Sequence, residues 1–231
     1  MRIDSLKNSP DRAGRYWLTF EDGTKLALYR QTVEDFGLYF GKELTEEETQ
    51  QLLTAAGKMS AKMRAVRIVS AANVSRRDLE ERLVRKGEDP QQAREAVAWM
   101  EDLHLVDDRN TAEQVIHSCI SKGYGLARAK QALFEKRIPK EYWEEALADY
   151  PDQWEKIEKF LRSRLDEDSD DKQVKKAIDA LLRRGHSYGT IRRVLNELSF
   201  DSEDYIEDFK LWQILVLFLL AAPRTKWTAS G

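Results

Sequence analysis

The sequence contains little of the chemistry on which most enzymes and secreted proteins rely. Its 231 residues include one cysteine, Cys119, and three histidines. A single cysteine excludes an intramolecular disulfide and a cysteine cluster that binds metal. The first residues, MRIDSLKNSPDR, lack the apolar stretch of a signal peptide. We therefore expect a cytoplasmic protein.

Turn-forming residues are also scarce, and neither sign of charge is in large excess. Only 11 Gly and 5 Pro are present, too few for the many turns of an all-β fold. Charged residues make up 34% and hydrophobic residues 42% of the chain, which is typical of helices with wide solvent-exposed faces. The net charge of −3 lacks the basic excess of proteins that bind naked nucleic acid. Charge therefore favours a protein partner.

One segment, Leu211–Ala222, reads LWQILVLFLLAA and is almost entirely apolar, and Pro223 ends it. A helix of this length spans about 18 Å, short of the roughly 30 Å hydrocarbon core of a bilayer. We therefore expect no membrane contact and prefer a terminal helix that covers one end of the fold. A membrane-associated scaffold is the weakest alternative.

The N-terminal region predicts a β-hairpin. Aromatic and aliphatic residues run from Tyr16 to Phe20 and from Leu26 to Tyr29, on either side of Asp22-Gly23. This arrangement is the strongest short-range signal for a hairpin. Thr45, followed by three glutamates, then predicts the start of a helix.

A helical pattern continues from there to about residue 200, and it repeats. Ser75 is placed to cap a helix in a capping-box arrangement with Asp78, Gly87 to end that helix, and Pro90 to begin the next. The pattern returns after 50 residues and again after a further 48. Corresponding positions are Leu79, Ala129 and Ala177; Leu83, Leu133 and Leu181; Gly87, Arg137 and Gly185; and Ala93/Val97/Met100, Trp143/Leu147/Tyr150 and Ile191/Leu195/Leu198. A further helix is expected before each pair, at roughly 60–73, 109–121 and 152–166.

A period of about 50 residues indicates a repeat array, because neighbouring units bury the apolar surface that each exposes alone. We predict a mainly α protein, a tandem array of three three-helix repeats preceded by a small N-terminal β-hairpin segment. The predicted boundaries are 1–44 for the hairpin segment, 45–106, 107–150 and 151–200 for the repeats, and 201–231 for the apolar segment and tail.

Residues that could carry chemistry are isolated or have a structural explanation. The histidines lie far apart, the acidic pairs precede helices that they can cap, and the glycine turn is too short to cradle phosphate. Cys119 aligns with Val69 and is expected in the core. These residues are His104, His117 and His186, the pairs Asp107-Asp108 and Asp170-Asp171, the turn Gly123-Tyr124-Gly125, and Cys119. We expect no catalytic residue, no metal and no cofactor.

Basic residues recur where the middle helix of each repeat ends. They would stabilise the helix C-terminus by about 0.3–1 kcal/mol each, and they would also offer a periodic partner positive charge at regular intervals. We call the whole set of candidate partner-binding and DNA-binding residues the basic ladder. It comprises Arg76, Arg77, Arg82, Arg85, Lys86, Lys130, Lys136, Arg137, Lys175, Lys176, Arg183, Arg184, Arg192 and Arg193.

Three stretches together make the chain resemble the RecX family of regulatory proteins. They are SRRDLEERLVRKG (75–87), LVDDRNTAEQVIHSCISKGYGLARAKQALFEKRI (105–138) and AIDALLRRGHSYGTIRRVL (177–195). The hairpin with GKELTEEE is similar to the N-terminal extension of longer members. The sequence departs from the family at Arg137, where glycine is usual, so we expect that helix to end differently. The C-terminus after about Asp201 matches nothing in the family pattern.

This resemblance implies a non-enzymatic regulator that binds the RecA recombinase filament and suppresses its ATPase, strand-exchange and co-protease activities. It therefore implies a role in DNA repair and the SOS response. Single- or double-stranded DNA would be a weaker partner, and a monomer is expected. The alternative is a helical-repeat module that binds DNA without a recombinase.

Overall fold

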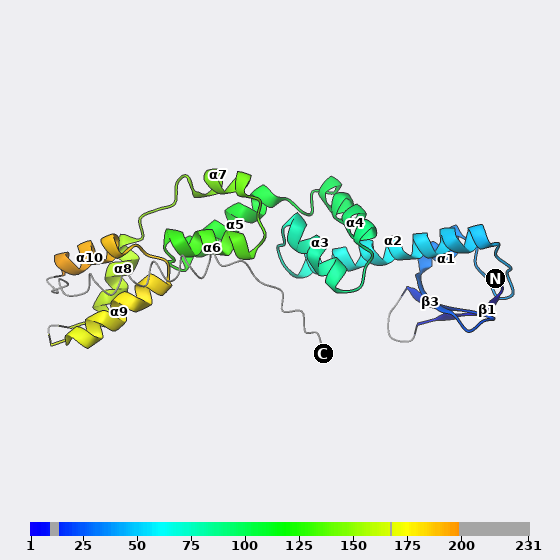
Figure 1. Ribbon diagram of the computed structural model, residues 1–231, viewed down its shortest axis with the longest axis horizontal. Coiled ribbons are helices and arrows are strands. Elements are labelled where there is room, and N and C mark those ends of the chain that lie inside the picture. The colour runs from blue at the N-terminus through cyan, green and yellow to red at the C-terminus, as the bar shows by residue number, and fades with distance from the viewer. Residues whose placement is uncertain (10–13, 167, 199–231) are drawn as a thin grey trace, which may run out of the picture. The chain divides into compact units, whose positions relative to one another are not determined.

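The computed structural model describes residues 1–9, 14–166 and 168–198, in which a small antiparallel sheet precedes a series of helices (Figure 1). The strands are β1 (Ile3–Asn8), β2 (Arg15–Phe20) and β3 (Lys25–Tyr29). The helices are α1 (Arg30–Asp35), α2 (Glu46–Ala71), α3 (Arg76–Arg85), α4 (Pro90–Asp102), α5 (Asp108–Ser121), α6 (Leu126–Glu135), the 3₁₀ turn η1 (Lys140–Tyr142), α7 (Trp143–Leu147), α8 (Trp154–Arg162), α9 (Asp171–Arg183) and α10 (Tyr188–Glu197). The predicted fold class, mainly helical with a small N-terminal β segment, is confirmed.

The chain divides into two compact units, which we describe separately. Unit 1 comprises Met1–His117 and Ala132–Asp149, and unit 2 comprises Ser118–Gln131 and the described residues from Tyr150 onward. The division passes through α5 and α6, which belong to the predicted second repeat. The boundaries at 106 and 150 stay a prediction.

The sheet in unit 1 contains the predicted hairpin and one strand more. Tyr16 lies opposite Leu28 across β2 and β3, as the turn at Asp22-Gly23 predicts. Sequence analysis missed β1, which pairs with the other edge of β2. A β-bulge at its start interrupts the alternation of apolar and polar residues, so the usual strand signal is weak there.

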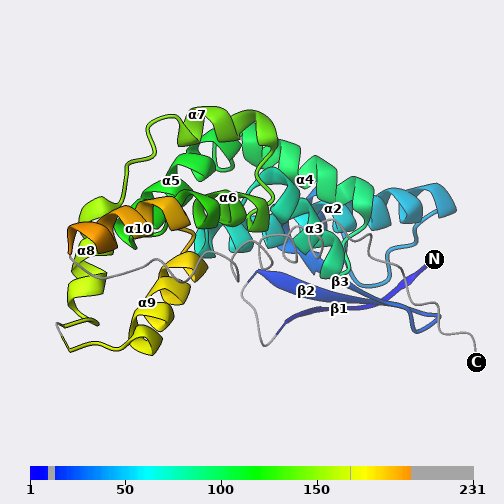
Figure 2. The ribbon, with the colours of Figure 1, turned by 60° about the vertical axis from the view of Figure 1, so that its left-hand side comes forward.

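One face of the sheet packs against helices. Leu18, Phe20 and Leu28 point to this face and form a buried core with Leu52 and Ala56 of α2. Figures 1 and 2 show α1 and α2 on this side of the sheet. The side chains between these core positions in the strands point to the opposite, outer face.

Helix α2 links the sheet to the first helical repeat. It begins at the predicted cap: the Thr45 side chain accepts a hydrogen bond from the Glu48 N–H, and the Glu48 carboxylate accepts one from the Thr45 N–H. The helix then runs without a break to Ala71, so the helical segment expected at roughly 60–73 forms the C-terminal part of this longer helix. Gly57 lies inside it, where a β-carbon would collide with the Gln92 side chain of α4.

The first helical repeat in unit 1 has the predicted caps and core. The Ser75 hydroxyl accepts the Asp78 N–H at 3.1 Å, and Asp89 caps α4 with Pro90 at its first position. The capping box is only half formed, because the Asp78 carboxylate accepts a hydrogen bond from Arg82. Buried core residues from α2, α3 and α4 are Ala61, Ala65, Leu79, Leu83, Ala93, Ala96, Val97 and Met100.

In unit 2, α8, α9 and α10 lie together around a second core (Figure 2). Asp170 caps α9 in a capping box with Gln173, which confirms its expected structural role, and Ser187 caps α10. The buried residues of this core include Ile157, Leu161, Ala177, Leu181, Ile191 and Leu195. The predicted apolar positions of the third repeat therefore face a common interior, with Leu198 packed at its margin.

The last helix predicted for the second repeat is shorter than expected. Trp143 and Leu147 lie in the five-residue α7, whereas Tyr150 lies beyond it. Pro139 and Pro151 flank this segment, and a residue before proline disfavours the helical conformation. Tyr150 instead donates its hydroxyl to the Tyr124 carbonyl at 2.6 Å, and burial raises the pKa of this phenol to about 12.

Within the described residues, no helix is both long enough and apolar enough to span a bilayer. The apolar segment 211–222, for which a covering helix was predicted, lies outside the described residues.

Candidate partner-binding surface

The basic ladder was predicted from pairs at helix C-termini, and the structure places them there. Arg85 is the last residue of α3 and Lys86 its C-cap, and Arg183 and Arg184 hold the same places in α9. These cations therefore lie where the carbonyl end of the helix dipole favours positive charge.

All three middle helices end with the same backbone turn. Gly87, Arg137 and Gly185 each follow the cap with a positive φ, of 89°, 59° and 85°. In α6 the N–H groups of Arg137 and Ile138 donate to carbonyls of the last turn at 3.0 and 3.1 Å, and the other two turns have equivalent bonds. This is the Schellman motif. The expectation that arginine forces a different closure is wrong, because Arg137 itself adopts the left-handed conformation.

The second basic pair is offset from the other two by one residue. Because Arg137 stands in the place of glycine, the residue of α6 that corresponds to Arg85 and Arg183 is Glu135. One position of the ladder thus carries a carboxylate. The spacing of charge along the repeats is less regular than the sequence pattern indicated.

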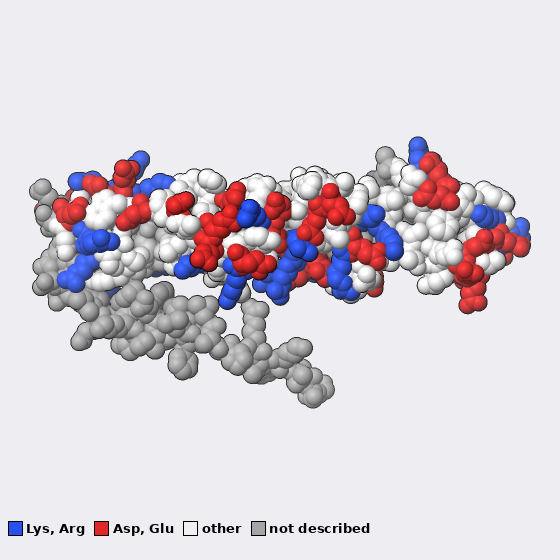
Figure 3. Space-filling model, turned by 90° about the horizontal axis from the view of Figure 1, so that it is seen from above, with Lys and Arg blue, Asp and Glu red and all other residues white. Residues whose placement is uncertain are grey.

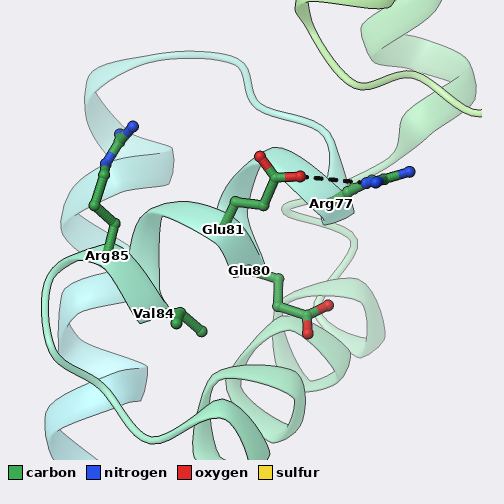
Figure 4. Close-up of a pocket in the computed structure, with 5 residues that line it drawn as sticks. All are labelled: Arg77, Glu80, Glu81, Val84 and Arg85. Atoms are coloured by element: carbon green, nitrogen blue, oxygen red, sulfur yellow. Dashed lines mark hydrogen bonds and ion pairs between the residues drawn. The ribbon is translucent and has the colours of Figure 1, made fainter. Parts of the chain in front are cut away.

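Four cations of the ladder form ion pairs within unit 1, with three carboxylates between them. The ion pairs are Arg76–Glu101 at 2.8 Å, Arg82–Asp78 at 2.8 Å, Arg77–Glu81 at 3.3 Å and Arg137–Glu81 at 3.2 Å. Figure 4 shows the Arg77–Glu81 pair on the exposed face of α3. Solvent-exposed pairs such as Arg77–Glu81 and Arg137–Glu81 contribute about 0–1 kcal/mol each to stability. Their main consequence is that the paired carboxylates lower the positive potential that these arginines present to a partner.

Other members of the ladder are exposed, and their side chains form no hydrogen bond or ion pair with the part of the chain that the structure describes. They are Arg85, Lys86, Lys130, Lys176 and Arg183. In Figure 4 the Arg85 side chain extends away from the Arg77–Glu81 pair. These five cations are exposed members that the described residues leave without an ion pair.

The remaining cations have intermediate environments. The Arg184 guanidinium lies 4.6 Å from the centre of the Phe160 ring, and that of Arg193 lies 5.9 Å from a Trp154 ring. Such contacts orient a cation without neutralising it. The Lys136 ammonium donates to the Asn73 carbonyl at 3.3 Å. Lys175 is exposed and Arg192 is half-buried.

Acidic and basic side chains alternate over the surface drawn in Figure 3, and neither sign forms a continuous field there. A partner would therefore contact separate groups of basic residues at the helix ends. The alignment of these basic groups along one surface stays a prediction, because α3 and α9 belong to different units.

Within unit 1, α3 is joined to the next repeat by a buried polar contact. The fully buried Ser75 donates its hydroxyl to the Lys136 carbonyl at 2.6 Å, and the Arg76 N–H donates to the Asp108 carboxylate at 2.8 Å. Asp108 is only 5% exposed, and burial raises the pKa of its carboxyl group. We call Ser75, Arg76, Asp108 and Lys136 the first junction.

Within unit 2, the start of α6 is joined to the end of α9 mainly by backbone. The Gly125 N–H donates to the Arg184 carbonyl at 2.8 Å, and the Ala127 N–H to the Gly185 carbonyl at 3.2 Å. The buried His186 Nε2 lies 3.0 Å from the Gly123 carbonyl and donates to it. We call Gly123, Gly125, Ala127 and the turn 184–186 the second junction.

The residues examined for chemistry have structural environments. His104 and His117 are exposed, Cys119 is buried as expected, and Asp107 caps α5 through the Asn110 N–H at 3.1 Å. Asp108 caps α3 and not its own helix, which sequence reasoning did not foresee. Among the described residues, no three His, Cys, Asp or Glu side chains are grouped as metal ligands.

The two junctions were missed although the sequence carries a signal for them. Ser75 and Gly125 are separated by the 50-residue shift that relates the first two repeats, and both precede a middle helix. A small residue at this position in both repeats indicates close approach by a neighbouring segment. The sequence does not show which residue Ser75 or Gly125 contacts.

Three comparisons with known proteins agree. A family model for the second three-helix domain of RecX matches residues 107–147. Regulatory protein RecX of Clostridioides difficile (strain 630) is 27% identical over 210 residues, which cover 88% of this chain and 97% of that protein. Regulatory protein RecX of Chlorobaculum tepidum is 33% identical over 143 residues, covering 60% and 88%. A crystal structure of regulatory protein RecX, 20% identical, matches the fold with a TM-score of 0.57 over 84% of this chain and 98% of that one.

The helical repeats and their likeness to regulatory proteins along most of the chain define a non-enzymatic regulatory protein of helical-repeat architecture. The chain belongs to the RecX family.

Proposed function

We propose that this protein binds the RecA recombinase filament and inhibits its ATPase, strand-exchange and co-protease activities, thereby modulating DNA repair and the SOS response. The observation that carries the proposal is a pair of cations at matching ends of α3 and α9, Arg85 and Arg183, which form no ion pair with the described residues, in a chain of the RecX family. In this proposal the protein inhibits the filament by binding to it, and no covalent bond is made or broken.

The distribution of charge supports a protein as the main partner. The net charge is −3, and acidic side chains interrupt the basic ones on the surface shown in Figure 3. Long-range attraction to phosphates is therefore weak, whereas local charge pairs with a protein surface set orientation and specificity. DNA is a weaker partner in this proposal, and the protein acts as a cytoplasmic monomer.

Charge reversal at the unpaired cations tests the proposal. The variant Arg85→Glu/Arg183→Glu should weaken inhibition of DNA-dependent ATP hydrolysis by the recombinase by about tenfold or more, equivalent to about 1.4 kcal/mol. The matched control is Arg94→Glu/Arg162→Glu. It makes the same change in net charge, with one substitution in each unit, at arginines that pair with Glu80 and Glu158 outside the ladder.

The control should leave inhibition within about twofold of the original protein. Equal inhibition by both double variants, with helix content unchanged, would mean that Arg85 and Arg183 serve only their own helix ends.

A module that binds DNA without a recombinase is the alternative function. It predicts that affinity for DNA falls steeply with salt, because each neutralised phosphate releases counterions. Binding to DNA alone should therefore be compared with binding to recombinase-coated DNA across the same salt range. The proposed function requires tighter, less salt-dependent binding to the coated DNA, and the alternative requires the reverse.

A further inference from the structure

The outer face of the sheet in unit 1 carries aromatic and basic side chains that the basic ladder does not include. Strand alternation places them opposite the buried face formed by Leu18, Phe20 and Leu28. The aromatic and basic residues on the outer face are Lys7 of β1, Arg15 and Trp17 of β2, and Lys25 and Tyr29 of β3.

Trp17 lies at the centre of this face. It is paired with Lys7 on one side and with Ala27 on the other, so that directly opposed β-carbons are about 4.5–5.5 Å apart. Ala27 has too short a side chain to cover the indole, and 46% of Trp17 is exposed. The centre of the sheet therefore presents an open aromatic surface.

The cations around Trp17 have little competition from carboxylates. The Arg15 guanidinium lies 4.8 Å from the centre of the Tyr29 ring, and its buried Nε has no hydrogen-bond partner in the described part of the chain. Lys7 and Lys25 are exposed and form no ion pair with described residues. Among residues of the three strands, Asp4 alone is acidic, and it lies in the bulge outside the paired register.

Two carboxylates next to the strands, in the turn after β2, are engaged at the hairpin end. Glu21 pairs with Arg2 at 3.3 Å, and Asp22 accepts hydrogen bonds from Thr24. The central rows of the outer face thus keep a positive charge next to an exposed indole. A negatively charged ligand with a flat apolar ring complements both features.

We propose that the outer face of the sheet binds single-stranded nucleic acid, with Trp17 stacking on an unpaired base and Lys7, Arg15 and Lys25 contacting the flanking phosphates. Base stacking on an aromatic side chain contributes about 1–3 kcal/mol per base and tolerates any sequence. A duplex hides the faces of its bases, so this surface selects single strands. The site adds to the proposed function and does not require the recombinase.

Fluorescence anisotropy of a labelled oligothymidine, titrated with the full chain in the absence of recombinase, tests the proposal. Trp17→Ala should weaken binding about 5- to 100-fold, and Trp17→Phe should restore most of it because phenylalanine keeps an aromatic face. In the original protein, oligothymidine should also protect Trp17 from acrylamide quenching, measured as the difference from Trp17→Phe.

The phosphate contacts have a separate readout. Lys7→Ala/Lys25→Ala should lower the slope of log affinity against log salt by about 1.4, since each single-strand contact contributes about 0.7. Lys140→Ala/Lys172→Ala, which removes two exposed lysines elsewhere, should leave the slope unchanged. The proposal is overturned if the original protein binds duplex as tightly as single strand, if Trp17→Phe binds no better than Trp17→Ala, or if Trp17 is not protected.

Discussion

Ser75 and Gly125 occupy corresponding places fifty residues apart, yet they join their neighbours by different chemistry. In the first junction, a buried hydroxyl and a buried carboxylate make the contacts, through Ser75 to Lys136 and through Asp108 to Arg76. In the second, Gly125 and Ala127 make them through their own N–H groups. The first junction therefore depends on titratable and side-chain groups, whereas the second depends on how closely two backbones approach.

This difference shows that a repeated backbone path does not require a repeated side-chain pattern. At Gly125 a β-carbon would collide with the Gly185 carbonyl, so glycine is the only residue that allows the backbone contact. At Ser75 the side chain fills the corresponding space and supplies the hydrogen bond. Each junction should consequently fail under a different perturbation.

The largest effect is expected from Gly125→Ala. The added methyl group would force two backbones apart and break the hydrogen bond from Gly125 to Arg184, for a loss of about 3 kcal/mol or more in the free energy of unfolding. Gly189→Ala in α10 is the matched control, because its β-carbon would meet only the Ser187 hydroxyl at 3.9 Å. That control should gain about 0.5–1 kcal/mol. Urea denaturation of both variants measures the difference, and equal stabilities would contradict the proposed close contact.

The second effect is expected from Asp108→Ala, which removes the acceptor of the Arg76 N–H. A buried donor left without a partner costs about 1–3 kcal/mol. Asp107→Ala removes instead an exposed cap of α5 and should cost about 0.5–2 kcal/mol. Denaturation at neutral pH compares the two, and a larger loss for Asp107→Ala would be inconsistent with the assigned role of Asp108.

The two junctions should also respond to pH in opposite directions. In the first, burial raises the pKa of Asp108 above its ordinary value of 3.8, so the folded state holds the proton more tightly. Stability from this group is therefore lost as pH rises from about 3.8 through the folded pKa. In the second, burial lowers the pKa of His186 below 6.5, and stability is lost as pH falls from 6.5 through the folded pKa.

Unfolding free energy should be measured against pH for the original protein, Asp108→Asn and His186→Gln. Each variant should lose only the slope that belongs to its own group. Profiles that stay parallel to the original one across both pH windows would show that neither group couples folding to protons.

The smallest effect is expected at the helix ends. Arg137→Gly relieves a left-handed arginine but removes the exposed pair with Glu81, and we expect a net gain of about 0.5–1 kcal/mol. Gly87→Ala is the converse control, since a β-carbon there meets nothing within 4 Å and only the backbone penalty of about 1 kcal/mol is added. Thermal unfolding measures both, and a loss of stability in Arg137→Gly would mean that the Glu81 pair outweighs the strain.

Local signals in the sequence predicted most of the fold. Thr45, Ser75 and Asp170 cap helices as their spacing predicts, and the turn at Asp22-Gly23 joins two strands. Predictions failed where a local signal was overridden by distant contacts. The strand β1 was missed, because it pairs with β2 despite its bulge.

The candidate site was predicted less well than the fold. The basic pairs were found at helix ends, but sequence alone could not show that Glu81 would pair with both Arg77 and Arg137 while Arg85 forms no ion pair with the described residues. Glu81 meets Arg77 within one helix and Arg137 from another repeat, and only the second contact depends on the fold. The offset of one residue at Arg137 was likewise hidden, because arginine there adopts the conformation usual for glycine.

The most direct test of the regulatory role is a titration of this protein into the cognate RecA recombinase hydrolysing ATP on single-stranded DNA. We expect ATP hydrolysis to fall progressively as the protein is added. Unchanged hydrolysis at concentrations where the protein is bound to the coated DNA would contradict the account.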